Sequence, residues 1–177
     1  MASELHVDAI KHSGGTSALT IDSSGNLTAS AKLHSAGHVI QLVTNTYSTE
    51  TAISSSTYTD SGLTCQITPK FSSSKIFILV SQHMMLTHPT ADTGAGWKIF
   101  RDSTQVKASS VNYAIYVYTS HASEINIRGW QNWNYLDSPS STSQLTYKTQ
   151  ISKYGGGSLE IQDANNPSTM TLMEIAQ

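Results

Sequence analysis

The sequence has little charge and almost no cysteine. Only 12% of its 177 residues are Asp, Glu, Lys or Arg, about half the share of roughly 25% that is usual in soluble domains. The 10 basic residues are scattered, which argues against nucleic-acid binding driven by phosphate neutralisation. Cys65 is the single cysteine, so no intrachain disulfide can form. Its place in an alternating run predicts a packed thiol on a strand.

Long hydrophobic runs are also missing. No apolar stretch approaches the roughly 20 residues of a transmembrane helix. Residues 1–10 lack the basic start and the apolar core of a secretory signal. We therefore expect no membrane insertion, and synthesis in a cytoplasm. No window of about 12 residues shows a 3.6-residue period with caps, so no helix is predicted.

Hydroxyl and aromatic residues take the place of charges. The chain contains 28 Ser, 21 Thr, 8 Tyr and 3 Trp, and short alternating runs separated by turn residues recur from His38 onward. Residues 76–80 are apolar throughout, which predicts a central strand covered on both sides. This spacing predicts an all-β fold, a jelly-roll-like β-sandwich over residues 37–177. The expected strands are 39–46, 63–68, 75–82, 97–102, 105–108, 111–119, 124–134, 144–152, 158–162 and 169–175.

Residues 1–36 differ from the rest and form a short N-terminal β or extended segment. Residues 5–9 alternate as in a short strand, and a turn sequence over 22–26 predicts a hairpin between 19–21 and 27–29. Large apolar residues are too few here to close a core. The segment must therefore pack on the main domain, on copies of itself or on a partner, and Gly37 is the expected joint.

No motif for catalysis or metal binding is recognisable. No His-x-His pair occurs, and His34 and His38, which are four residues apart around a glycine, lie where no helix is predicted, so no metal site is predicted. The histidines are His6, His12, His34, His38, His83, His88 and His121. No Gly-x-Ser-x-Gly elbow occurs, and Gly94-Ala95-Gly96 leads into a strand instead of a phosphate-binding helix. Paired carboxylates from distant strands stay open as an alternative. We predict no catalytic residue, no cofactor and no enzymatic activity.

Three aromatic residues form the candidate ligand-binding group. Trp130, Trp133 and Tyr135 lie among Asn and Gln residues, a combination that sugar-binding surfaces use. On a strand, Trp130 lies on one face, and Trp133 and Tyr135 lie on the other, so at least one face is expected to be core. The alternatives are contact with a host-surface glycan or protein, and structural packing of the whole set.

The last expected strand, 169–175, is apolar on both faces. Met170 and Leu172 face one way, and Met173 and Ile175 face the other. One face can serve the domain core and the other a threefold interface between copies of the chain. We therefore predict a homotrimer, with these four residues as interface candidates.

Several short motifs are informative when they are taken in order along the chain. They are Gly37-His38-Val39-Ile40-Gln41, Tyr58-Thr59-Asp60-Ser61-Gly62-Leu63, Ile67-Thr68-Pro69, Trp97-Lys98-Ile99-Phe100-Arg101-Asp102, Tyr135-Leu136-Asp137-Ser138-Pro139 and Leu172-Met173-Glu174-Ile175-Ala176. Over about residues 37–177 the chain resembles a domain found in structural proteins of tailed bacteriophages of marine bacteria and cyanobacteria. The resemblance implies a virion structural protein and carries no catalytic motif.

Two functions are consistent with that resemblance. In the first, the protein is a trimeric short tail fibre or fibre tip, attached to other virion proteins through residues 1–36 and contacting the host surface with the sandwich. In the second, it decorates or cements the capsid or serves as a tail adaptor. A glycan-degrading enzyme is a third alternative. For the first two, the expected location is the virion, after synthesis in the host cytoplasm.

Overall fold

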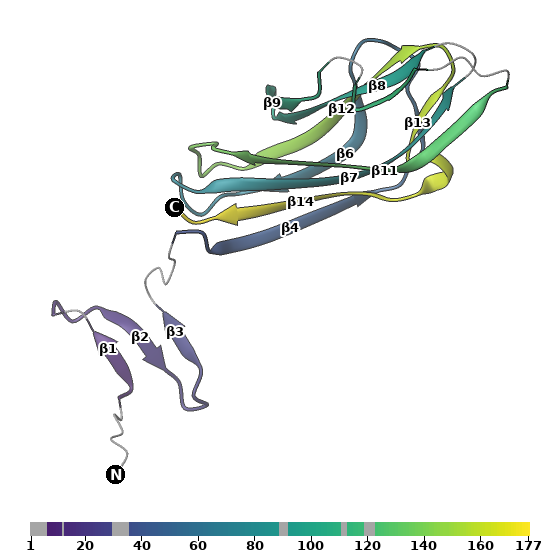
Figure 1. Cartoon of the computed structure of the whole chain (residues 1–177). Helices are drawn as coiled ribbons and strands as arrows, with labels where there is room; N and C mark the ends of the chain where they lie inside the picture. Colours follow the sequence, from purple (N-terminus) through teal and green to yellow (C-terminus); the bar gives the residue numbers. More distant parts are fainter. Residues whose placement is uncertain (1–6, 12, 30–35, 89–91, 111–112, 119–122) are drawn as a thin grey trace. The chain divides into compact units, whose positions relative to one another are not determined.

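The chain divides into two compact units, residues 1–35 and 36–177. A computed structural model describes residues 7–11, 13–29, 36–88, 92–110, 113–118 and 123–177 (Figure 1). In these ranges the secondary structure is β-strand, apart from one short 3-10 helix, η1 (Asp163–Asn165). The all-β prediction is therefore confirmed.

The smaller unit is a three-stranded antiparallel sheet in the order β1–β2–β3. Its strands are β1 (Ala9–Lys11), β2 (Ser17–Ile21) and β3 (Leu27–Ala29). The predicted hairpin joins β2 to β3, and Asp22 fixes its turn by accepting hydrogen bonds from the backbone N–H groups of Ser24 and Asn26. None of the side chains described in this unit is buried, which agrees with the shortage of large apolar residues.

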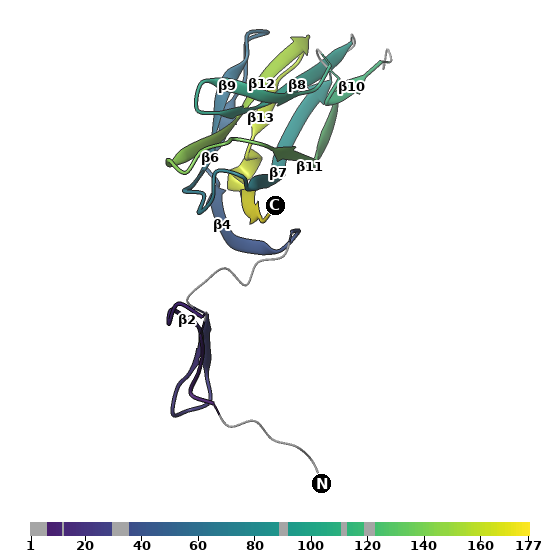
Figure 2. The same ribbon diagram turned by 90° about the vertical axis from the view of Figure 1, so that its left-hand side faces the viewer.

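The larger unit is a sandwich of two antiparallel sheets, which confirms the predicted jelly-roll-like architecture. A five-stranded sheet has the order β10–β8–β12–β6, with β9 also paired to β8. A six-stranded sheet has the order β4–β14–β7–β13–β5, with β11 also paired to β7. Figures 1 and 2 show β8 and β12 in one layer and β7 and β4 in the other. The strands are β4 (Val39–Tyr47), β5 (Thr51–Ala52), β6 (Thr59–Ile67), β7 (Lys75–His88), β8 (Thr93–Arg101), β9 (Thr104–Ala108), β10 (Ile115–Val117), β11 (Ile125–Asp137), β12 (Leu145–Gly155), β13 (Leu159–Ile161) and β14 (Ser168–Ile175).

Aromatic and ionic contacts join the two sheets across the core. Trp97 of β8 and Trp133 of β11 are buried and stack with ring centroids 4.6 Å apart. Asp137, at the end of β11, accepts hydrogen bonds from Arg101 of β8 and from the hydroxyl of Tyr147 of β12. Thr149 of β12 also donates to Oε1 of Gln82 of β7 at 3.0 Å, so the core has polar links beside its apolar contacts.

Strand β7 corrects one expectation. Ile76, Ile78 and Val80 are buried against the other sheet, but Phe77 is only partly buried and Leu79 is 36% exposed. The prediction that residues 76–80 are covered on both sides is wrong for the single chain, because the sandwich has two layers and nothing in the described part of the chain covers this side of β7. β7 also runs six residues beyond the expected end, since β11 pairs with it as far as His88.

A buried carboxylate holds one end of the sandwich together. We call this end, where β4 begins and β14 ends, the base. Glu174 is fully buried and accepts hydrogen bonds from the backbone N–H groups of Lys70 and Phe71 and from Nε2 of Gln41. Burial acts to raise the pKa of Glu174, but the hydrogen bonds, led by that of Lys70, outweigh it and lower the pKa. The ionised form is therefore the one that stabilises the fold.

We expect Glu174→Gln to lower the free energy of unfolding by about 1–3 kcal/mol at neutral pH. The side-chain NH2 group of the new glutamine cannot accept a hydrogen bond, so it would face one of the donors that Glu174 now satisfies. A lowered folded-state pKa gives stability that is present above the unfolded pKa of about 4.3 and is lost as pH falls through the folded value. The difference between variant and parent should therefore shrink in acid. Urea unfolding at neutral and acidic pH measures it, with the exposed Glu124→Gln as control. A difference independent of pH would contradict the role of the ionised carboxylate.

Candidate functional site

The outer face of the six-stranded sheet carries a row of apolar side chains. We use "outer face" for the side of β4, β14, β7 and β11 that points away from the five-stranded sheet. Leu42, Met173, Phe77 and Leu136 lie in register across these four strands. Leu42 is 54% exposed and Leu136 is 45% exposed. Exposed apolar side chains that are contiguous in this way typically mark an interaction site.

Hydroxyl and amide groups lie beside the apolar row. The next row across the sheet is Thr44, Thr171, Leu79 and Asn134, and the hydroxyl oxygens of Thr44 and Thr171 are 3.2 Å apart. A shallow depression of about 290 Å³ lies over β7. It is lined by Leu79, Val80, Ser81, Asn132, Trp133, Asn134, Thr169 and Thr171. The outer face is therefore apolar toward the base and polar but uncharged in the row of Thr44, Thr171 and Asn134.

Charge is sparse on this face. From the base as far as Ser81, its outward positions are Val39, Leu42, Thr44 and Thr46 on β4, Thr169, Thr171, Met173 and Ile175 on β14, Lys75, Phe77, Leu79 and Ser81 on β7, and Asn132, Asn134 and Leu136 on β11. All of these positions are described, and Lys75, at the base, is the one charged residue among them. Farther along β11, Trp130 and Arg128 lie on the same side, and Arg128 is paired with Asp163. The part of this face nearest the base therefore offers a charged partner few ionic contacts.

The four interface candidates on β14 divide between the two sides of the sheet. Met170 and Leu172 are fully buried in the core. Met173 and Ile175 lie on the outer face and are partly buried. The alternation that the sequence indicates is therefore present, and only the second pair is available to another protein. Whether copies of the chain meet there stays a prediction.

The aromatic group predicted from the sequence is not brought together. Trp130 lies on the outer face, where its indole N–H donates to the carbonyl of Pro167 at 3.1 Å and its ring contacts the edge of His83. Trp133 is buried against Trp97, and Tyr135 packs against the core. Strand alternation separates the set, so Trp130 is the member that retains an exposed ring.

A second aromatic cluster was not recognised from the sequence. The ring of Tyr116 contacts the rings of Tyr113, Tyr118 and Tyr154 at the end of the sandwich opposite to the base. We call these four residues the tyrosine cluster. Tyr113 is 65% exposed and Tyr118 is 79% exposed. The sequence signal is the spacing of three tyrosines within residues 113–118, inside the expected strand 111–119. Tyr154 lies far away in sequence, so only strand pairing could place it beside them.

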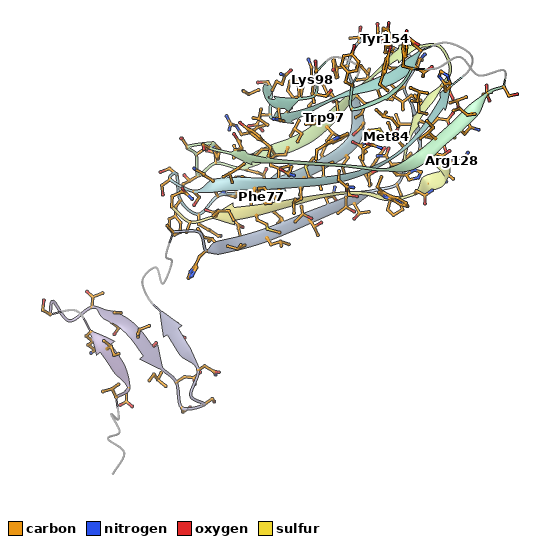
Figure 3. All side chains as sticks on the ribbon, viewed as in Figure 1. Phe77, Met84, Trp97, Lys98, Arg128 and Tyr154 are labelled. Atoms are coloured by element: carbon orange, nitrogen blue, oxygen red, sulfur yellow. The ribbon has the colours of Figure 1, made fainter. Side chains whose placement is uncertain are left out.

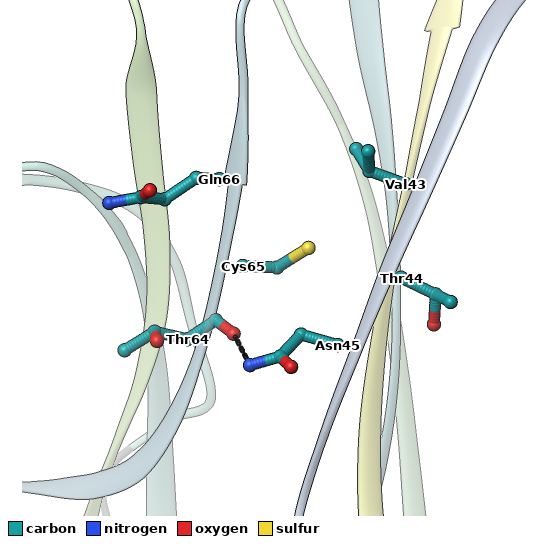
Figure 4. Close-up of a pocket in the computed structure, with 6 residues that line it drawn as sticks. All are labelled: Val43, Thr44, Asn45, Thr64, Cys65 and Gln66. Atoms are coloured by element: carbon teal, nitrogen blue, oxygen red, sulfur yellow. Dashed lines mark hydrogen bonds between the residues drawn. The ribbon is translucent and has the colours of Figure 1, made fainter.

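Titratable groups form no metal-binding cluster in the described ranges. There, no group of three or more His, Cys, Asp or Glu residues could hold a metal ion. His6, His12, His34 and His121 lie outside the described residues. Cys65 is buried on β6 beside a groove of about 280 Å³ between β4 and β6 (Figure 4), and burial raises the pKa of its thiol. A buried thiol of raised pKa is a poor nucleophile, as expected for a packed residue.

Comparisons with known proteins give only distant similarities. No family model matches the chain, and no curated protein matches it. Among solved structures, a subviral particle of infectious bursal disease virus VP2 is 15% identical with a TM-score of 0.35, covering 78% of this chain and 38% of VP2. The T13 particle of the same virus is 13% identical with a TM-score of 0.40, covering 78% and 36%. Dimeric latent PorU of Porphyromonas gingivalis is 10% identical with a TM-score of 0.32, covering 81% and 14%.

The chain therefore spans well under half the length of the structures it resembles. TM-scores of 0.40 and below do not establish a common function. In the described ranges, no helix is long and apolar enough to cross a membrane.

Proposed function

We propose that this protein is a non-enzymatic virion structural protein, a homotrimeric short tail fibre or fibre tip that takes part in host attachment. The observation that carries the proposal is the outer face of the six-stranded sheet, which is apolar and nearly uncharged. The ordered motifs that resemble a tailed-phage structural domain support the assignment to a virion. In this proposal the outer face joins copies of the chain, and residues 1–36 join the trimer to other virion proteins.

A second copy of the chain is the partner that suits the outer face best. In a trimer whose outer faces surround the threefold axis, residues near the axis lie close to their own copies, so like charges there would repel one another. The outward positions of this face carry almost no charge and avoid that cost. Burial of Leu42, Leu136 and the exposed part of Leu79 would then supply the association energy, at about 25 cal/mol per Å² of apolar surface.

We expect the parent protein to have the mass of a trimer by light scattering at micromolar concentration. The double variant Leu42→Ser with Leu136→Ser should be a folded monomer with an unchanged circular dichroism spectrum, because both side chains are about half exposed in the single chain. Tyr118→Ser, which removes an exposed ring elsewhere, is the matched control and should stay trimeric. A monomeric parent protein, or a double variant that remains trimeric, would contradict the proposed interface.

We expect deletion of residues 1–36 to leave a folded trimer that no longer enters phage particles. The small sheet has no buried side chain in its described part, so its own burial contributes little against an ordering cost of about 1–2 kcal/mol per residue. Contacts outside the unit must then supply the stabilisation. The test supplies full-length or shortened protein in trans to a phage that lacks the gene, and antibody labelling locates the protein on the particle.

The labelling pattern decides between the two virion roles. Label at the tail supports the fibre proposal, whereas label over the head would favour capsid decoration. Equal incorporation of the shortened and full-length proteins would place the anchor in the sandwich instead of in residues 1–36.

A further inference from the structure

The tyrosine cluster depends on a glycine at the centre of three strands. Gly94 of β8 is paired with Tyr116 of β10 on one side and with Tyr154 of β12 on the other. Residues paired directly across a sheet point to the same side, so both tyrosine rings flank a position that has no side chain. The two rings approach each other across it, with centroids 6.1 Å apart.

Two further rings extend this surface. Tyr118 follows Tyr116 by two residues and therefore lies on the same side of the chain. Their rings are 6.4 Å apart and only 14° from parallel, and the ring of Tyr113 meets Tyr116 edge to face at 5.2 Å. The result is a group of adjoining rings in which Tyr116 is central and Tyr113 and Tyr118 are the most exposed.

The central ring is held in place by a carboxylate. The hydroxyl of Tyr116 donates to Oδ2 of Asp92 at 2.9 Å, and this hydrogen bond is the main cause that raises the pKa of Tyr116 to about 12. Lys153 precedes Tyr154 on β12 and therefore points to the opposite side of the sheet, and its ammonium group donates to the carbonyl of Gly155 at 2.7 Å. The cluster therefore has a carboxylate beside it, which disfavours an anionic ligand.

The cluster also lies where a partner outside the assembly can reach it. β4 begins and β14 ends at the base, and β7 runs from the base to His88 at the opposite end. Thr93 and Gly155 are paired at that opposite end, next to the cluster. Figure 3 shows Tyr154 there, far from Phe77 of the outer face. A trimer formed through the outer face would leave these rings free.

We propose that the tyrosine cluster is a binding site for a neutral saccharide, which stacks the C–H faces of its rings on Tyr113, Tyr118 and Tyr154 and hydrogen-bonds to their hydroxyls. The inference deepens the proposed attachment role and rests on it. A saccharide suits the cluster because each exposed large side chain described in it combines a flat apolar face with a hydroxyl. A protein receptor is the alternative that the test below separates.

The test uses full-length protein on an array of neutral oligosaccharides built from hexoses, deoxyhexoses and N-acetylhexosamines, with sialylated and phosphorylated glycans beside them. Affinity for a retained glycan is then measured by calorimetry. We expect Tyr118→Ala to weaken binding by about tenfold, the effect of losing one stacked ring. Tyr118→Phe, which keeps the ring, should stay within about threefold of the parent. Trp130→Ala, an exposed aromatic on the other sheet, should bind like the parent.

Three outcomes would overturn the inference. They are retention of no neutral glycan, retention of charged glycans alone, and equal loss of binding in Tyr118→Ala and Trp130→Ala. The protein could also adsorb to host cells, lose that adsorption when the cells are treated with protease, and retain no glycan. That result would indicate a protein receptor and would also overturn the inference. If antibody labels the phage particles but the protein binds no glycan, this inference alone is refuted. If the protein binds a glycan but antibody does not label the particles, the virion role alone is refuted.

Discussion

Ile78→Ala is expected to lower the free energy of unfolding by about 2–5 kcal/mol, a large part of the roughly 5–15 kcal/mol that a domain has. Ile78 is fully buried near the start of β7, between Leu172 of β14 and Tyr135 of β11 in register. Truncation leaves a cavity that paired strands on both sides cannot close. Urea unfolding monitored by tryptophan fluorescence measures the loss. A variant that melts within about two degrees of the parent would show that Ile78 is not core.

Leu79→Ala is the matched control for this experiment. The residue is the next one along β7 but points to the outer face. In the isolated chain its truncation should cost less than about 1 kcal/mol, because it is already partly exposed. In a trimer built through the outer face, the same variant should weaken association while leaving the fold intact. The pair of variants therefore separates the core of one chain from the interface between chains.

Asp137→Ala is expected to cost about 2–4 kcal/mol, because it leaves a buried phenol and a partly buried guanidinium without their acceptor. Asp137 is buried and accepts from Arg101, which is partly exposed, and from the hydroxyl of Tyr147, which is fully buried. Burial and the hydrogen bond to Asp137 raise the pKa of Tyr147, so the phenol stays protonated as the donor. Removing the carboxylate leaves both donors without the group that accepts from them.

A double variant tests whether unpaired charge is the cause. Arg101→Met with Asp137→Leu removes both charges and fills a similar volume, so it should recover most of the stability that Asp137→Ala loses. Tyr147→Phe, which removes a single hydroxyl, should cost less than Asp137→Ala. Thermal unfolding of the four proteins gives the comparison. If Asp137→Ala unfolds within about 1 kcal/mol of the parent, the link between the sheets is not a stabilising one.

Local patterns in the sequence predicted much of the fold. The period of two in 169–175 placed Met170 and Leu172 on one side of β14 and Met173 and Ile175 on the other, because side-chain alternation is a property of the strand itself. The turn at Asp22 was equally local, since its hydrogen bonds span at most four residues. The two-residue strand β5 was missed, because it is too short to show a period and exists only through its pairing with β13.

The candidate sites depended on pairing between distant segments. Trp130, Trp133 and Tyr135 are close in sequence, yet alternation sends Trp130 outward and the other two toward the core. Tyr116 and Tyr154 are far apart in sequence, yet both are paired with Gly94. The cluster they form could not be read from either segment alone, because no local rule states which strand is the neighbour of β8.

Local sequence patterns are enough to predict that this protein is built of strands, where most of them lie, and which side chains share a face, because period, turn residues and strand propensity act over a few residues. Which face is buried depends on how the sheets pack. The sandwich has two layers, so Ile78 lies inside and Leu79 outside although both are apolar. Register across β4, β14, β7 and β11 then aligned Leu42, Met173, Phe77 and Leu136 into one surface, and such alignment depends on hydrogen bonding between strands that are distant in the chain.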